Sequence, residues 1–141
     1  MIRPFKSSDM NDVIDIWLKA SIQAHNFVDR KFWVSRTDDM RDIYIPASDT
    51  YVFKEDDVIK GFFSLHEDTL AAMFVAPSFQ GKGIGRQLMK KAVSLRSKLC
   101  LTVYQGNSRS IKFYNQSGFA IRTEKVDEHT GHIELLMEYN L

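Results

Sequence analysis

Short runs of apolar and β-branched residues predict a chain that is rich in strands. The runs at residues 50–54 and 58–65 are separated by Glu55-Asp56-Asp57, and this pattern predicts a β-hairpin. Further strands are predicted at residues 2–5, 70–75, 99–104, 119–125 and 132–139. The last two of these flank a short polar turn that contains Gly131, so we expect them to close the sheet as a pair.

Apolar residues at three- and four-residue spacings predict a helix near the start of the chain. Its apolar face would consist of Met10, Val13, Ile14, Trp17 and Leu18, with Ser7 or Ser8 as the N-cap and Asp9 in the first turn. Two further helices are predicted at residues 83–95 and 107–117, and Gly118 would end the second. Residues 21–45 are less regular, and they predict a second short helix and loops.

The order of these elements predicts a mixed α/β fold with one central sheet. The helix at residues 83–95 joins two strands, 70–75 and 99–104, and such a crossover favours a parallel pair. The hairpins elsewhere make the rest of the sheet antiparallel, with helices on both faces. No repeat or Pro/Gly/Ser-rich linker divides the chain, so we expect residues 1–141 to form one domain.

Composition narrows the class of protein. Lys and Arg number 19 and Asp and Glu 18, which gives a net charge of +1, so no overall field attracts nucleic acid or an anionic membrane. The single cysteine, Cys100, cannot form an internal disulfide, and its apolar surroundings in the sequence predict a buried structural thiol. No signal peptide and no run of about 20 apolar residues is present. These features predict a cytoplasmic protein.

A glycine-rich turn stands between the strand 70–75 and the helix that follows it. Gly81, Gly83 and Gly85 alternate there, and a strand, a glycine turn and a helix start together make an anion site. A Walker A loop would need Ser or Thr after Lys82, and a dinucleotide fingerprint would need a different glycine spacing. Both common nucleotide motifs are therefore excluded by spacing, and a plain glycine-rich connection is the remaining structural alternative.

Two motifs resemble those of the GNAT superfamily of CoA-dependent N-acetyltransferases. The pattern Gln80-x-x-Gly83-x-Gly85 resembles the pyrophosphate loop of that superfamily, and the segment from Asn107 to Phe119 is similar to its N-x-x-[AS]-x-x-[FL]-Y-x-x-x-G-F pattern. The motifs occur in the expected order, and the resemblance covers essentially the whole chain. The subgroup that it resembles, small bacterial single-domain acetyltransferases that include protein-lysine enzymes, is indicated by Trp17, His25, Phe27, Trp33 and the run 73–77.

The resemblance implies acetyl-CoA as cosubstrate, bound largely by backbone groups. The pyrophosphate would lie against the turn and the helix start, formed by Gln80, Gly81, Lys82, Gly83, Ile84, Gly85 and Arg86. The pantetheine arm would run along Met73, Phe74 and Val75, and the following strand would splay away to admit it. Asn107 matches a position whose amide hydrogen-bonds this arm, although Asn is equally suited to cap the helix that starts there.

Tyr114 is the residue that we expect to carry chemistry. A tyrosine is protonated at neutral pH and can donate its proton to a departing CoA thiolate. The alternative is an aromatic residue that only packs on the core beside Phe113.

The general base is left open. The strand 70–75 contains no acid, whereas Glu67, Asp68 and His66 precede it as base candidates or as solvated turn residues. His25 is a base candidate or a hydrogen-bonded structural residue. Water is the remaining acceptor for the proton.

The predicted activity is transfer of an acetyl group from acetyl-CoA to a primary amine, by direct attack in a ternary complex. The acceptor would be a protein lysine or a small amine and would lie near Trp17, His25, Phe27 and Trp33. The alternative function is an inactive CoA-binding or sensor module. No metal is expected, because the spacing of His129 and His132 fits a solvated hairpin better than a metal site. The protein would act as a monomer or a homodimer.

Overall fold

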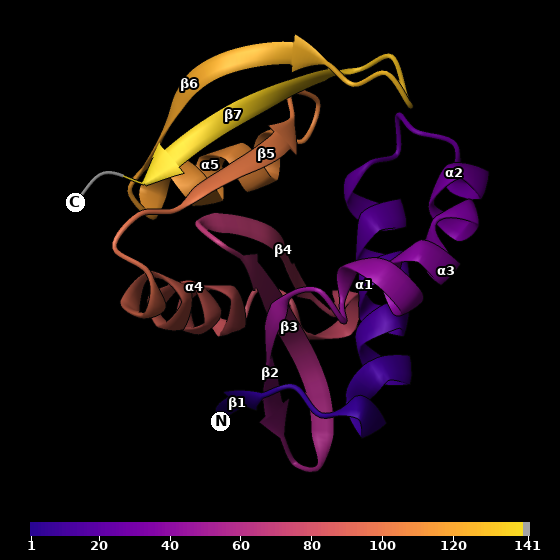
Figure 1. Ribbon diagram of the computed structural model, residues 1–141, viewed down its shortest axis with the longest axis vertical. Helices are drawn as coiled ribbons and strands as arrows, with labels where there is room; N and C mark the ends of the chain where they lie inside the picture. The colour runs from indigo at the N-terminus through magenta and orange to yellow at the C-terminus, as the bar shows by residue number, and fades with distance from the viewer. Residues whose placement is uncertain (140–141) are drawn as a thin grey trace.

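The computed structural model describes residues 1–139, which are built around one seven-stranded sheet of order β1-β2-β3-β4-β5-β7-β6 (Figure 1). The strands are β1 (Ile2–Pro4), β2 (Asp49–Glu55), β3 (Val58–His66), β4 (Thr69–Val75), β5 (Cys100–Tyr104), β6 (Phe119–Val126) and β7 (Ile133–Tyr139). Within this range every neighbouring pair is antiparallel except β4 and β5, which are parallel. The predicted mixed α/β fold with one parallel pair is confirmed.

Helices cover both faces of the sheet, as predicted. The helices are α1 (Met10–Ala24), α2 (Arg30–Ser35), α3 (Thr37–Asp39), α4 (Ile84–Leu95) and α5 (Ser108–Gln116), with shorter turns η1 (Ser7–Asp9), η2 (Met40–Tyr44) and η3 (Pro77–Phe79). One core lies between α1–α2 and the sheet residues Val52 and Phe62, while a second lies under α4 and includes Leu88, Leu101 and Met137. No helix in residues 1–139 combines the length and the apolar character that crossing a bilayer requires.

The strands β4 and β5 share only one paired position. Thr69 is opposite Cys100 and no further pair follows, so the two strands diverge toward their carboxyl ends (Figure 1). Beyond this point β4 stays paired with β3 as far as Val75, and β5 stays paired with β7. The expected splay is present, and it leaves the facing edges of β4 and β5 free of each other.

Two local predictions were wrong. Neither Ser7 nor Ser8 caps the first helix, and both are exposed. The buried carboxylate of Asp9 accepts the backbone N–H of Lys6 at 2.8 Å and binds the Arg3 guanidinium at 2.8 and 3.0 Å. Cys100 is half-buried rather than buried, because it lies beside Thr69, where β4 and β5 meet, with its Sγ 3.5 Å from the Thr69 hydroxyl.

Candidate active site

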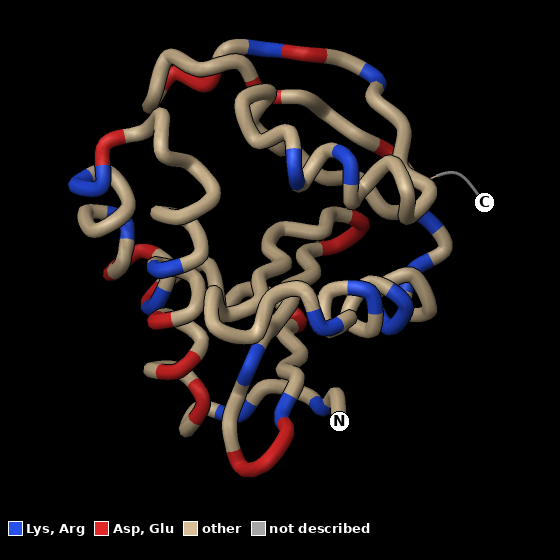
Figure 2. The backbone as a smooth tube through the Cα atoms, turned by 180° about the vertical axis from the view of Figure 1, so that it is seen from behind, with Lys and Arg blue, Asp and Glu red and all other residues tan. Residues whose placement is uncertain are grey.

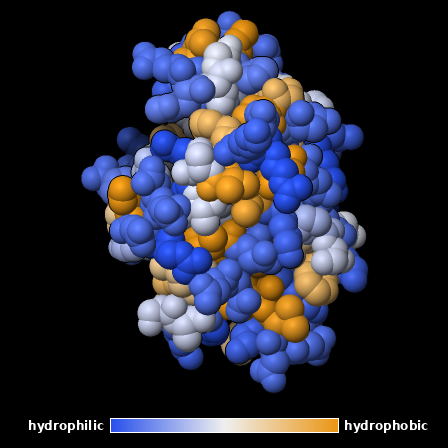
Figure 3. Space-filling view, turned by 90° about the vertical axis from the view of Figure 1, so that its right-hand side faces the viewer, coloured by the Kyte–Doolittle hydropathy of each residue, from blue (hydrophilic) through white to orange (hydrophobic). Residues whose placement is uncertain are grey.

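A cavity of about 900 Å³ lies where β4 and β5 diverge. The glycine turn, β4, β5 and α5 line it on one side, and residues of α1 and α2 line it on the other. On the side of the molecule that faces the viewer in Figure 3, apolar side chains gather near the middle among polar ones. The cavity therefore connects the two layers of helices through the splay in the sheet.

The glycine turn at one end of this cavity has a backbone geometry suited to an anion. Gly81 and Gly83 have φ angles of 79° and 83°, a left-handed conformation that favours glycine, and Gly83 is the N-cap of α4. A Cβ added at either position would meet no atom within 4 Å, so open space lies above the backbone. The first N–H groups of α4 have no partner within the helix. Together, the exposed amides and the open space fit a diphosphate.

The charges near this end are basic. Neither α4 nor α5 contains an acidic residue, and Lys and Arg residues lie along both helices (Figure 2). Arg86 and Arg109 line the cavity, and of these the sequence analysis identified only Arg86. Lys82 behaves differently: its side chain is exposed, its Nζ lies 5.7 Å from the centre of the Phe79 ring, and it does not line the cavity.

Gln80 fastens the turn to three neighbouring elements. Its amide nitrogen donates to the Val75 carbonyl and to the Gln23 side chain, both at 3.0 Å. Its amide oxygen accepts from the Arg109 guanidinium at 3.4 Å. The geometry of Gln80 therefore suits it to hold the turn in position. The predicted pantetheine edge, Met73, Phe74 and Val75, lines the cavity as half-buried residues.

Tyr114 reaches the cavity from α5 together with Phe113. Its ring makes edge contacts with the rings of Phe113 and Phe119, with centroids 5.6 and 5.9 Å apart. Burial raises the pKa of the Tyr114 phenol to about 12, since the charged form is poorly solvated there. The phenol therefore holds its proton at neutral pH, in the state that a proton donor needs.

Asn107 and His25 form a buried link between α5 and the end of α1. The Asn107 side-chain oxygen caps α5 by accepting the Ser110 N–H at 3.2 Å, so the capping role is observed. His25 Nδ1 lies 2.9 Å from the Ser21 carbonyl, which can only accept, so this nitrogen carries the proton. His25 Nε2 then accepts from the Asn107 amide at 3.3 Å. Because desolvation lowers the pKa of His25, the ring is neutral with both nitrogens engaged.

Aromatic rings form a wall of the cavity on its α1–α2 side. Trp17, His25 and Trp33 line the cavity, as does Tyr104, which sequence reasoning missed. Phe27 is not part of the lining; its ring packs on the backbone of Gly106, where an added Cβ would lie only 2.8 Å away. Of the four residues predicted to lie near the acceptor, Trp17, His25 and Trp33 therefore line the cavity, and Phe27 does not.

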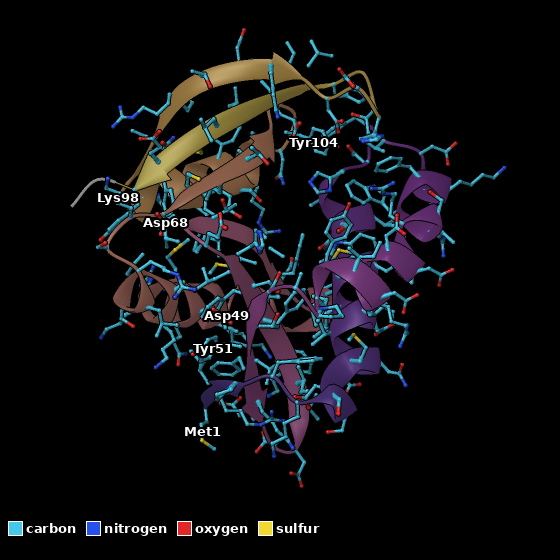
Figure 4. All side chains as sticks on the ribbon, viewed as in Figure 1. Met1, Asp49, Tyr51, Asp68, Lys98 and Tyr104 are labelled. Atoms are coloured by element: carbon cyan, nitrogen blue, oxygen red, sulfur yellow. The ribbon has the colours of Figure 1, made fainter. Side chains whose placement is uncertain are left out.

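The base candidates near β4 lie outside the cavity. Glu67 and Asp68 are exposed residues of the β3–β4 turn, and Figure 4 shows Asp68 close to the end of the sheet where β4 and β5 meet. His66 is exposed, with its Nδ1 3.2 Å from the Ala47 carbonyl. None of the three lines the cavity. Their geometry is that of turn residues.

Further lining residues were not identified from the sequence. Ser108, Arg109 and Ser110 line the cavity. All three lie inside the second motif, so the motif could have indicated them. Glu134 on β7 also lines it, and no local pattern could have singled it out. Among residues 1–139, no group of three His, Cys, Asp or Glu side chains is arranged to hold a metal.

Comparison with known proteins agrees with this geometry. A sequence profile described as an acetyltransferase (GNAT) domain matches residues 46–121. The chain is 36% identical over 122 residues to the peptidyl-lysine N-acetyltransferase YiaC of Escherichia coli K12, covering 86% of this chain and 84% of the relative. It is 26% identical over 121 residues to the peptidyl-lysine N-acetyltransferase YjaB of the same strain, covering 85% and 82%.

Solved structures show the same fold. The solution structure of apo YjaB from Escherichia coli superposes with a TM-score of 0.86 at 25% identity, covering 99% of this chain and 96% of that one. The PaiA N-acetyltransferase of Thermoplasma acidophilum in complex with coenzyme A gives a TM-score of 0.85 at 17% identity, covering 100% and 98%. The acetyl donor of this enzyme class is acetyl-CoA, which the glycine turn of this chain fits. The chain belongs to the GNAT acetyltransferase family.

Proposed function

We propose that the chain acetylates the side-chain amine of protein lysines. In this reaction the amine attacks acetyl-CoA directly, within a ternary complex. The observation that carries the proposal is the shared cavity, in which the protonated phenol of Tyr114 and the anion-binding glycine turn line the same space. Residues 1–141 act as one domain in this proposal. A cytoplasmic location, and a monomer or homodimer, stay predictions.

The donor is held chiefly by the backbone in this proposal. The amides of residues 81–86 receive the diphosphate, and the side chains of Arg86 and Arg109 add positive charge at that end. In this proposal the free edge of Met73, Phe74 and Val75 accompanies the pantetheine arm, and the amide of Asn107, a buried residue of the cavity lining, hydrogen-bonds the same arm. When the carbon–sulfur bond breaks, Tyr114 donates its proton to the sulfur of CoA.

Protein lysine is the acceptor that two observations support. The two relatives named above carry that activity in their names. The aromatic wall of Trp17 and Trp33 suits the aliphatic stem of a lysine, which can lie along apolar rings while its amine stays polar. A small primary amine is the competing acceptor, and an inactive CoA-binding module is the competing function.

Two measurements test the proposal. Acetyl-CoA should raise the melting temperature, and CoA should be released when a lysine-containing peptide with a blocked N-terminus is added. The same peptide with Ala in place of Lys is the control. Transfer only to small amines would replace the proposed acceptor. Binding of acetyl-CoA with no transfer to any amine would favour the binding module.

A further inference from the structure

We propose that Glu134 is the carboxylate that receives the ammonium group of the acceptor and takes the proton that acetyl transfer must remove. The inference rests on the proposed lysine acetyltransferase function. It starts from one observation: among residues 1–139, Glu134 is the only Asp or Glu that lines the cavity. Nothing in the two sequence motifs points to it.

Strand pairing determines the face of the sheet on which Glu134 lies. Glu134 on β7 is opposite Tyr104 on β5, and residues directly opposite in an antiparallel pair project to the same face. Tyr104 contacts the rings of His25 and Phe27, with centroids 5.3 and 5.8 Å apart. Glu134 therefore projects to the face covered by α1 and α2, next to the aromatic wall.

The neighbouring residues of the same strands project to the other face. Leu101 and Val103 of β5, with Leu135 and Met137 of β7, are buried in the core under α4. Tyr114 packs against that same core. The proposed proton donor and Glu134 therefore stand on opposite faces of the sheet, and the cavity that both line connects them through the splay.

Charge is separated along the cavity. Its basic side chains, Arg86 and Arg109, belong to α4 and α5 beside the glycine turn, whereas Glu134 stands on the α1–α2 face. A diphosphate is attracted to the first end and an ammonium to the second. The cavity thus offers opposite charges to two substrates of opposite charge.

The other titratable groups of the lining are poorly suited to accept the proton. His25 uses both ring nitrogens in hydrogen bonds, and its pKa is lowered by desolvation. The phenol of Tyr104 donates to Asp127, and burial together with that bond raises its pKa. Tyr114 is proposed as the donor of the opposite proton. Glu134 is left as the acceptor.

Several charged or titratable groups stand close to Glu134. Tyr104 is opposite it on β5, and Lys125 is opposite it on β6. His132 lies two residues earlier on the same side of the chain and contacts the Phe27 ring at 4.9 Å between centroids. Asp127 accepts a hydrogen bond from the Tyr104 hydroxyl. These groups are kept unchanged in the test.

The proton balance of the reaction closes with these two residues. Glu134 takes one proton from the ammonium, and the nitrogen lone pair forms the C–N bond to the thioester carbonyl carbon. The C–S bond breaks with its electron pair going to sulfur, which takes a proton from Tyr114. The second nitrogen proton leaves through water as Tyr114 is reprotonated. The sum is an amide, CoA thiol and one proton released to solvent.

The test compares Glu134→Gln with Glu138→Gln. Glu138 lies on the same face of β7 and outside the cavity, and its ion pair with Arg122 at 3.5 Å is solvent-exposed and contributes little. For a lysine peptide near neutral pH, Glu134→Gln should lower kcat/KM by about 10²–10⁴-fold, the usual contribution of a general base. Its log kcat/KM should then rise by about one per pH unit toward the amine pKa of ~10.4. Glu138→Gln should behave as the wild type.

Binding measurements separate the possible failures. Glu134→Gln should keep the acetyl-CoA thermal shift and bind the lysine peptide several-fold more weakly in the presence of CoA. Glu134→Asp, which keeps the charge on a shorter arm, should fall between wild type and Glu134→Gln, and it serves as the test if the Gln variant does not fold. Wild-type rates and pH profiles in both variants overturn the role of Glu134 alone. A wild type that transfers to no lysine peptide overturns the proposed function and, with it, this role.

Discussion

Replacing Tyr114 by Phe removes one oxygen atom from the cavity and leaves its surroundings in place. The ring contacts with Phe113 and Phe119 do not involve the hydroxyl, so the fold of α5 should persist. Without the phenol, the CoA thiolate must leave unprotonated or take its proton from water. We expect kcat to fall by about 10²–10⁴-fold, which corresponds to about 3–5 kcal/mol of barrier. The affinity for acetyl-CoA should change little.

The pKa of Tyr114 adds a second, independent expectation. A phenol of pKa about 12 is still about 99% protonated near pH 10, whereas one at the reference value would be about half ionised. The donor form is the protonated one, so activity that depends on it is present below this pKa and lost above it. Wild-type kcat should therefore hold on the alkaline side up to about pH 10.

The assay is CoA release from acetyl-CoA at saturating lysine peptide, with acetyl-CoA binding measured by thermal shift. Tyr139→Phe is the matched control, because Tyr139 packs against Phe119 outside the cavity and should keep wild-type kcat. A Tyr114→Phe enzyme with wild-type kcat would refute the donor role. A wild-type kcat that is already halved near pH 10 would refute the assigned pKa.

Two further substitutions, each with a matched control, test the glycine turn and the start of α1. Gly83→Ala and Gly131→Ala both force a left-handed residue in open space, so each should cost about 1–2 kcal/mol of stability in denaturant unfolding. Only Gly83→Ala should also weaken acetyl-CoA binding. An equal loss of binding in both variants would argue against a role of the glycine turn in binding acetyl-CoA. Asp9→Asn should lower the free energy of unfolding by about 2–3 kcal/mol. The control Asp15→Asn, at an exposed position, should lower it by under about 0.5 kcal/mol. Because Arg3 lowers the Asp9 pKa, this stabilisation should vanish as pH falls through that pKa in acid unfolding.

Local patterns predicted much of the fold and the position of the glycine turn. The glycine turn was predictable because its conformation depends on residues adjacent in sequence, and Gly81 and Gly83 have the positive φ that such a turn requires. The parallel pair followed from one intervening helix. The cap at Ser7 or Ser8 failed because Arg3, from a different element, binds Asp9 and leaves that carboxylate in position for the Lys6 amide.

The proposed acceptor end depends on contacts that the sequence does not display. His25 and Asn107 are 82 positions apart, and their bond exists only once α1 and α5 flank the same splay. Glu134 reaches the cavity through its register with Tyr104, and a shift of that register by one residue would turn it to the opposite face. Strand alternation could predict that Glu134 and Leu135 project to opposite faces of the sheet. It could not predict which of the two faces would hold the substrate.

The arrangement of the cavity favours direct transfer over a route through an acetylated cysteine. A route through an acetylated cysteine needs a thiol between the donor and the acceptor, and the chain has one thiol, Cys100. Cys100 sits beside Thr69 where β4 and β5 are still paired, and it does not line the cavity. The strands separate only beyond the Thr69–Cys100 pair. The splay that opens the cavity therefore begins after the position of the thiol. An amine entering from the α1–α2 face would meet the thioester through the opening itself, and this supports attack within a ternary complex.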